Sequence, residues 1–191
     1  MVFALERNNI FTLSDLFTTN YNKCMEKVRK VVHEDYLRSL MFGLQDGIVS
    51  TTGVVVGIST GVSDKAIIVL AALVAVSVEA TSMAAGQYSS EKAVHQMDKT
   101  GKHTDSLLVG AVIMFFAYMV GGMFSILPTL FIDQPQARLV AILSSFVGLF
   151  AIGYMKGLLV EGKPLRSAVE LFIIGGVATL IGLVVGHFLK V

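Results

Sequence analysis

Five long apolar runs, separated by short polar stretches, dominate the pattern of residues along the chain. Each run is long enough to cross the hydrocarbon core of a bilayer, which takes about 20 helical residues. The runs occupy roughly residues 41–63, 66–86, 107–132, 137–159 and 167–189. The pattern predicts an all-α integral membrane protein whose five transmembrane helices form one membrane domain, residues 41–191.

The connectors between the runs are short and carry turn-forming residues. They are a turn at Ser63-Asp64-Lys65, a polar loop over 87–106, a turn at Asp133-Gln134-Pro135 and a link from Glu161 to Arg166. No Gly or Pro occurs between Gln87 and Lys99, so the second span is expected to continue as a cytoplasmic helix through Met97.

Residues 1–40 form a polar segment before the first span. They contain no short apolar core followed by a small-residue cleavage site, so we expect no cleavable signal peptide. From about Tyr21 to Leu40 apolar positions recur at near-helical spacing, with basic residues between them. This predicts an amphipathic helix at the cytoplasmic membrane interface. A solvated helix leading into the first span fits the pattern equally well.

The distribution of Lys and Arg predicts the orientation, because short loops rich in these residues stay in the cytoplasm. The N-terminal segment, the 87–106 loop and the link before the last span carry 6, 3 and 3 of them. The opposite side carries only Lys65, Arg138 and Lys190. We therefore expect a cytoplasmic N-terminus and a C-terminus on the opposite side.

Composition agrees with a multi-pass membrane protein and excludes some partners. Hydrophobic residues make up 54% of the chain and charged residues 15%, and the mean hydropathy is +0.72. The net charge of +1 leaves no basic surplus for binding nucleic acid. Cys24 is the single cysteine, so no intrachain disulfide forms.

Small residues recur at four-residue spacing in the first and fifth spans. They are Gly43, Gly47, Gly53, Gly57 and Gly61, and then Gly182 and Gly186. Small residues let helix backbones approach closely in lipid. The motif leaves open whether the packing partner is a second copy of the chain or a neighbouring helix.

Among the carboxylic residues inside the apolar runs, where an ionisable group is costly and indicates function, Asp46 and Glu79 are the two that matter. Asp46 lies near the cytoplasmic end of the first span, and Glu79 lies about two turns in from the cytoplasmic end of the second. Met83 follows Glu79 by one turn on the same helical face, and Thr81 and Ser82 add hydroxyl groups nearby. Together these residues are candidate ligands for a cation in the cytoplasmic half of the membrane.

The thioether of Met83 bears on the identity of the cation. Carboxylates alone suit Mg²⁺, Ca²⁺ or Mn²⁺, whereas a thioether favours a softer transition metal such as Fe²⁺. Each residue also has a structural alternative. Met83 is as readily a packing residue, Asp46 a helix cap, and Glu79 a protonated carboxyl that bonds between helices.

Several stretches resemble the vacuolar iron transporter family. The most specific is Gly43-Leu44-Gln45-Asp46-Gly47-Ile48-Val49-Ser50-Thr51, which follows Leu37-Arg38 and is similar to the opening motif of that family's first span. Ser82-Met83-Ala84-Ala85-Gly86 with Tyr88, Gly121-Gly122 through Leu127-Pro128, and Gly175-Gly176 with Gly186 resemble later motifs. The resemblance covers about residues 37–190.

This resemblance implies a homodimeric transporter that moves Fe²⁺ and Mn²⁺ out of the cytosol in exchange for protons. The ions are then transported substrates and no cofactor is expected. Asp46 and Met83 match family motif positions and would bind the ion in transit between the two subunits' first and second spans. The membrane would be the cell membrane in a prokaryote and that of the vacuole or another organelle in a eukaryote.

The chain departs from the family pattern at three places. Many members have a small residue where Glu79 stands, and Gln87 stands where an acidic residue often follows the Ser-Met motif. The loop of about twenty residues over 87–106 replaces a long, Glu-rich cytoplasmic metal-binding domain. Within this short loop, Glu91 and His95 fall one helical turn apart and are candidates for sharing a metal.

Other functional classes are less consistent with the residues. An intramembrane enzyme needs a nucleophile with a base or a metal-activating set, yet His187 is the only histidine in or near a span. We therefore expect no enzymatic activity. The alternative function is a membrane scaffold or metal sensor without transport, in which the carboxyls serve assembly.

Overall fold

Long helices make up nearly all of the computed structural model, which describes residues 34–97 and 106–189. They are α2 (Glu34–Gly61), α3 (Lys65–Met97), α4 (Leu107–Phe131), α5 (Gln136–Lys156), the π-helical turn η1 (Gly157–Glu161) and α6 (Pro164–Phe188). In this described part of the chain, five helices are long and apolar enough to cross a membrane, the fourth running from Gln136 to Leu159. The prediction of an all-α protein with five spans is confirmed.

The helix ends differ from the predicted spans mainly on the side of the N-terminal segment. Helix α2 already begins at Glu34, so residues 34–40 belong to the first spanning helix. Helix α3 continues to Met97 as predicted. A helix continues through polar residues as well as apolar ones when no Gly or Pro interrupts it. Hydropathy therefore indicates which part of a helix lies in the membrane, but not where the helix ends. The rest of the predicted amphipathic helix lies outside the described residues.

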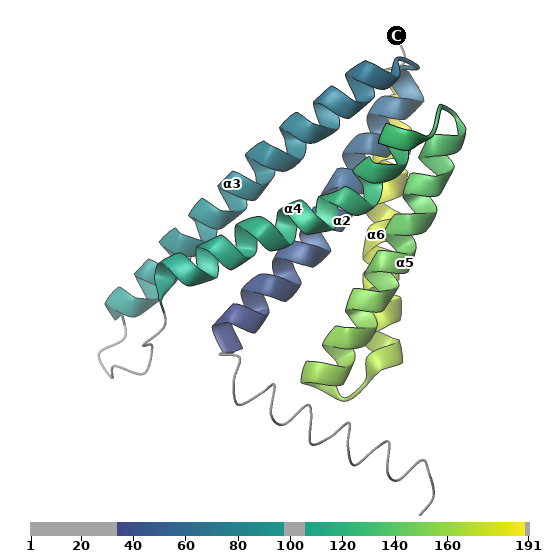
Figure 1. Cartoon of the computed structure of the whole chain (residues 1–191). Coiled ribbons are helices and arrows are strands. Elements are labelled where there is room, and N and C mark those ends of the chain that lie inside the picture. Colours follow the sequence, from purple (N-terminus) through teal and green to yellow (C-terminus); the bar gives the residue numbers. More distant parts are fainter. Residues whose placement is uncertain (1–33, 98–105, 190–191) are drawn as a thin grey trace, which may run out of the picture. The chain divides into compact units, whose positions relative to one another are not determined.

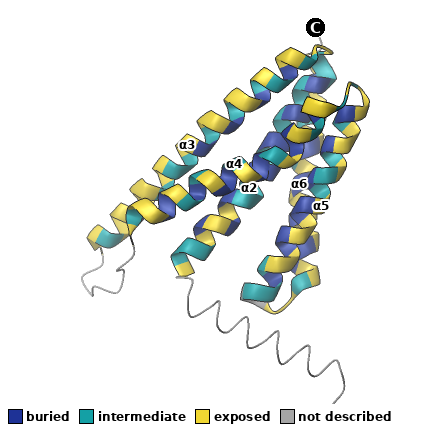
Figure 2. Cartoon of the chain, viewed as in Figure 1, coloured by how far each residue is buried: buried dark blue, intermediate teal, exposed yellow. Residues whose placement is uncertain are grey.

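Helix α2 lies at the centre of the bundle. It contacts α3, α4, α5 and α6, and α5 and α6 pack against each other. Helix α4 crosses α2 at an angle and lies against α3 along much of its length (Figure 1). Buried residues line the faces where helices meet and exposed ones face outward (Figure 2). Residues such as Leu70 on α3 and Phe131 on α4 are exposed apolar side chains, as expected for a surface that lipid covers.

The small residues of α2 pack against two helices of the same chain. A methyl group added at Gly121 of α4 would lie only 2.5 Å from the carbonyl oxygen of Leu44, and Gly47 of α2 meets the backbone of Tyr118. Further along α2, a methyl group at Gly57 would lie 3.1 Å from the carbonyl oxygen of Gly182 on α6. Both crossings bring backbones into direct contact. The spacing motif left open what these glycines pack against. In the structure they pack against neighbouring helices of the same chain.

Buried hydroxyl groups join three of the helices. The Thr52 hydroxyl on α2 lies 2.7 Å from that of Ser125 on α4, which lies 2.7 Å from that of Ser145 on α5. Each of these residues is buried. Such hydrogen bonds between helices are worth about 1 kcal/mol in a membrane. They help to fix how α2, α4 and α5 sit against one another.

The connecting turns follow ordinary capping chemistry. The carboxylate of Asp64 accepts hydrogen bonds from the amides of Ala66, at 2.8 Å, and Ile67, and so caps the start of α3. Next to it, the ammonium group of Lys65 lies 2.9 Å from the carboxylate of Asp133 in the turn between α4 and α5. Gly162 has φ 65°, a left-handed conformation that glycine adopts without strain, just before α6 begins.

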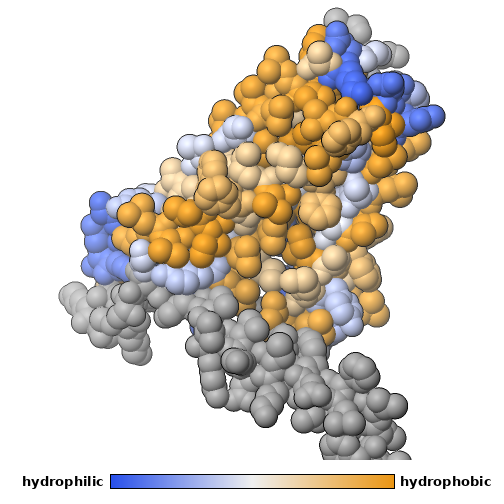
Figure 3. Space-filling model, in the orientation of Figure 1, coloured by the Kyte–Doolittle hydropathy of each residue, from blue (hydrophilic) through white to orange (hydrophobic). Residues whose placement is uncertain are grey.

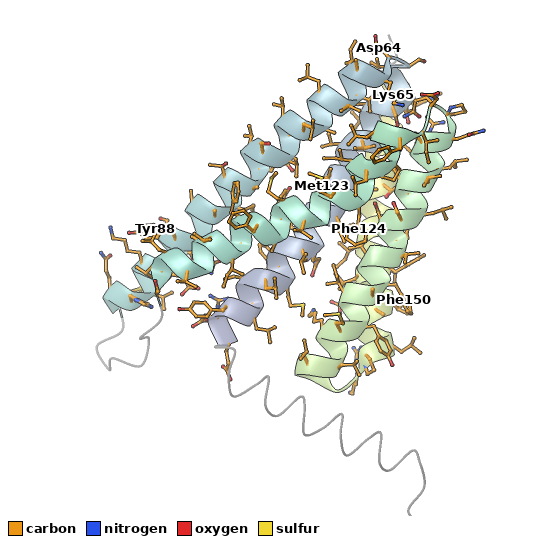
Figure 4. The ribbon with its side chains drawn as sticks, viewed as in Figure 1. Asp64, Lys65, Tyr88, Met123, Phe124 and Phe150 are labelled. Atoms are coloured by element: carbon orange, nitrogen blue, oxygen red, sulfur yellow. The ribbon has the colours of Figure 1, made fainter. Side chains whose placement is uncertain are left out.

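The two ends of the bundle carry different connections (Figure 1). The start of α2, the end of α3, the start of α4 and η1 lie at one end. The turn that contains Asp64 and Lys65 lies at the other end, and Tyr88 lies toward the opposite end of α3 (Figure 4). Apolar side chains cover the middle of the visible face, and hydrophilic ones gather toward the two ends (Figure 3). Which end faces the cytoplasm stays a prediction from the Lys and Arg distribution.

Candidate functional site

Glu79 lies at the meeting point of three helices and is held by hydroxyl groups from the other two. The hydroxyl of Ser50 on α2 donates to Glu79 Oε2 at 3.0 Å. The phenol of Tyr118 on α4 donates to the same oxygen and also contacts the Ser50 hydroxyl. This carboxyl of α3 is therefore fixed in position within the membrane-spanning part of the bundle.

Asp46 lies one helical turn before Ser50 on α2, which places both residues on the same face of the helix. Its side chain is half-buried. Ser50 itself donates to Glu79, so Asp46 lies one turn along α2 from a residue that contacts this carboxyl. A cation beside two neighbouring carboxyl groups would offset the repulsion between their negative charges.

Met83 lies one turn beyond Glu79 on α3 and packs against an apolar cluster that includes Val76, Ala80 and Tyr118. The thioether is therefore close to the helices that hold Glu79, and it also fills space between α3 and α4. The neighbouring hydroxyl residues, Thr81 and Ser82, are both exposed. Thr81 donates to the carbonyl of Ser77, one turn back on its own helix.

Ser50 and Tyr118 were not identified as site residues from the sequence. Tyr118 nevertheless carries a signal, because tyrosines in membrane helices gather at the interfaces and this one lies near the middle of α4. Its side chain is only 1% exposed. A buried phenol needs a hydrogen-bond partner, and a carboxyl on a neighbouring span is the natural one. Ser50 could be found as the residue one turn from Asp46.

The other candidate pair, Glu91 and His95, lies near the end of α3. The Glu91 carboxylate is buried and bonded to the guanidinium group of Arg38 on α2. The side-chain amide of Gln87 donates to it as well, at 3.0 Å. The charge of Glu91 is thus balanced by a cation of the protein itself. His95 lines a small cavity beside Glu91 and Tyr36.

Among the described residues, no group of three or more His, Cys, Asp and Glu side chains is arranged to hold a metal ion. Asp46 and Glu79 form a pair of carboxyls with a thioether in the neighbouring packing, and Glu91 and His95 lie in a separate place near the end of α3. The coordination of a metal by any of these residues stays a prediction.

Comparison with known proteins connects the chain to one family of transporters. A model described as the VIT family matches residues 37–106 and 93–187. The chain is 37% identical over 73 residues to vacuolar iron transporter 1 of Arabidopsis thaliana and 32% identical over 73 residues to that of Eucalyptus grandis. It is 36% identical over 70 residues to that of Oryza sativa subsp. japonica.

These pairwise matches cover only part of each protein. They take in 36 to 38% of this chain and 28 to 29% of the length of each relative. The chain thus matches less than a third of the length of the curated relatives. The family model is matched over a much larger part of the chain, including all five spanning helices.

Proposed function

Because the chain belongs to the VIT family, we propose that it is a multi-pass membrane protein that transports divalent transition-metal ions out of the cytosol. The substrates are Fe²⁺ and Mn²⁺, as the name of the matching plant relatives indicates for iron. The ions are cargo, and no resident cofactor takes part.

The observation that carries this proposal is the pair of carboxyls, Asp46 and Glu79, inside spanning helices. An ionisable group in the membrane is costly and is retained where it serves an ion pathway. Asp46 belongs to the first-span motif that resembles the family, and Glu79 is fixed nearby by Ser50 and Tyr118. The pair supplies negative charge, which compensates for the hydration energy that a divalent cation loses when it leaves water.

The nearby thioether supports a transition metal as substrate. Met83 lies one turn from Glu79 and packs beside Tyr118. Sulfur ligands favour softer ions over Mg²⁺ or Ca²⁺, whereas carboxylates accept either kind. Asp46, Glu79 and Met83, together with water, therefore form a mixed set that suits Fe²⁺ and Mn²⁺.

Transport in exchange for protons needs a group that changes its protonation as the metal passes, and Glu79 is the candidate. We expect Glu79→Gln to blunt the dependence of Mn²⁺ uptake on an imposed pH gradient, since the amide is permanently neutral yet still accepts bonds from Ser50 and Tyr118. The measurement is uptake into vesicles with and without the gradient. Glu34→Gln at the exposed start of α2, before the apolar run, is the matched control. An undiminished gradient response in the Glu79 variant would contradict the role.

The protein acts as a homodimer in this proposal. An apolar groove runs between α2 and α6 and is lined by residues that include Val54, Ile58, Ile181 and Val185. A second copy packed there would shield the adjoining polar face of α2 from lipid. Cysteines at position 54 are expected to crosslink two subunits, whereas Gly53 faces Ala178 of its own chain and is less suitable. A transport-active protein that stays monomeric would exclude the dimer.

The decisive experiment measures metal flux through the purified protein in vesicles. Fe²⁺ under anaerobic conditions and Mn²⁺ should both move, and empty vesicles should show neither. A scaffold or sensor would insert into the membrane and fold normally, but it would move neither ion. Flux that is absent for both metals in correctly folded protein would therefore exclude transport and favour the alternative function.

A further inference from the structure

We propose that Tyr118 and Ser50 are positioning residues that restrict Glu79 to metal binding through one oxygen, and that this restriction discriminates against Ca²⁺. The inference rests on the proposed metal site. It adds to that site two residues from other helices, together with a physical basis for selectivity. Both residues act on the metal through Glu79 rather than by touching it.

The hydrogen bonds around Glu79 are unequally divided between its two oxygens. The hydroxyls of Ser50 and Tyr118 both donate to Oε2. In the part of the chain that the structure describes, no side chain donates to Oε1. A carboxylate whose one oxygen already accepts protein hydrogen bonds has its other oxygen free for a cation.

The position of the Tyr118 donor is held by packing. The ring of Tyr118 is 1% exposed and belongs to the apolar cluster between α3 and α4, with Val76 and Ala80. The backbone of Tyr118 lies directly against Gly47 of α2, one turn from Ser50. The packing of α4 against α2 and α3 therefore keeps the Tyr118 phenol beside Glu79 Oε2, and the Ser50 hydroxyl adds a second bond to the same oxygen.

Coordination chemistry connects this arrangement to selectivity. Ca²⁺ takes 6–8 oxygen ligands and often binds a carboxylate through both oxygens, whereas smaller divalent ions need fewer ligands. Selectivity between such ions depends on the number and flexibility of the ligands. A carboxylate limited to one oxygen therefore removes a ligand that Ca²⁺ uses well and that Fe²⁺ or Mn²⁺ needs less.

The test is a competition between two ions on the purified protein in detergent. Free Mn²⁺ is measured by electron paramagnetic resonance while Ca²⁺ is added until half of the bound Mn²⁺ is released. With Tyr118→Phe, the affinity for Ca²⁺ relative to Mn²⁺ should rise about fivefold, the change in a binding ratio that corresponds to the net strength of one hydrogen bond. Ser50→Ala should shift the ratio in the same direction.

Two controls separate positioning from a general loss of structure. Tyr154→Phe removes a phenol from the exposed face of α5 and should leave the ratio unchanged. In a Glu79→Gln background, Tyr118→Phe should no longer alter the ratio, because Tyr118 acts through that carboxylate. A loss of fold would instead weaken both ions equally in either background. If Tyr118→Phe does not fold, Ser50→Ala carries the same test.

The outcomes distinguish this inference from the proposed transport. A shifted ratio in protein that moves no metal in vesicles would support the positioning role and exclude transport. An unchanged ratio in folded variants of a wild type that transports Fe²⁺ would overturn the positioning role alone. Wild-type protein that binds no Mn²⁺, or an effect of Tyr118→Phe that survives in the Glu79→Gln background, would also overturn it.

Discussion

Replacing Asp46 by asparagine should reduce the flux of both Fe²⁺ and Mn²⁺ by about a hundredfold, which is the effect of removing about 3 kcal/mol of charge compensation within the membrane. Asparagine keeps the size and hydrogen-bonding oxygen of the side chain but not its charge. The remaining carboxyl, Glu79, cannot by itself compensate for the water that a divalent ion gives up. Initial rates of uptake of the two metals into vesicles measure the effect.

The matched control for this variant is Asp133→Asn. Asp133 lies in the turn between α4 and α5, where its side chain is 90% exposed and pairs with Lys65. An exposed pair contributes little to stability, about 0–1 kcal/mol, so this variant should transport like the wild type. Equal flux through the Asp46 variant and the wild type would remove Asp46 from the metal pathway, and loss of Mn²⁺ flux alone would point to selectivity instead.

Replacing Gly121 by alanine should destabilise the fold by about 1–3 kcal/mol, which is the cost of overpacking in a protein interior. The added methyl group would lie 2.5 Å from the carbonyl oxygen of Leu44 and 3.1 Å from the amide nitrogen of Ile48. Both atoms belong to the backbone of α2, so no side chain can rotate away. Helices α2 and α4 must separate, which also draws the Tyr118 hydroxyl on α4 away from the Ser50 hydroxyl on α2.

Stability of the detergent-purified protein after heating, followed by its elution from a sizing column, measures this effect. The midpoint should fall by several degrees relative to the wild type. Gly86→Ala is the matched control, because a methyl group there has nothing within 4 Å and alanine is favoured over glycine in a helix. A Gly121 variant that survives heating as well as the Gly86 variant would show that the crossing can relax.

Much of the architecture could be predicted because hydropathy responds to the membrane directly. Each span must present about 20 apolar residues to lipid, and this requirement is local in the sequence. The turns could also be predicted from the sequence. Asp64 can cap the start of a helix, and Gly162 can adopt a left-handed backbone conformation. Hydropathy alone did not show that the helix of the first span begins at Glu34, although the spacing of apolar positions up to Leu40 predicted a helix there.

The candidate site was only partly accessible to sequence reasoning. The sequence by itself determined that Asp46 and Glu79 lie in spanning helices. It also predicted that both lie in the same half of the membrane, because position along a helix converts directly into depth. Only the tertiary structure decided that Ser50 and Tyr118 bind one oxygen of Glu79, and that Arg38 neutralises Glu91. These partners are 29 to 53 residues apart in the chain. Helical periodicity assigns each residue to a face, but which faces meet depends on how closely the backbones pack at glycines such as Gly47 and Gly121.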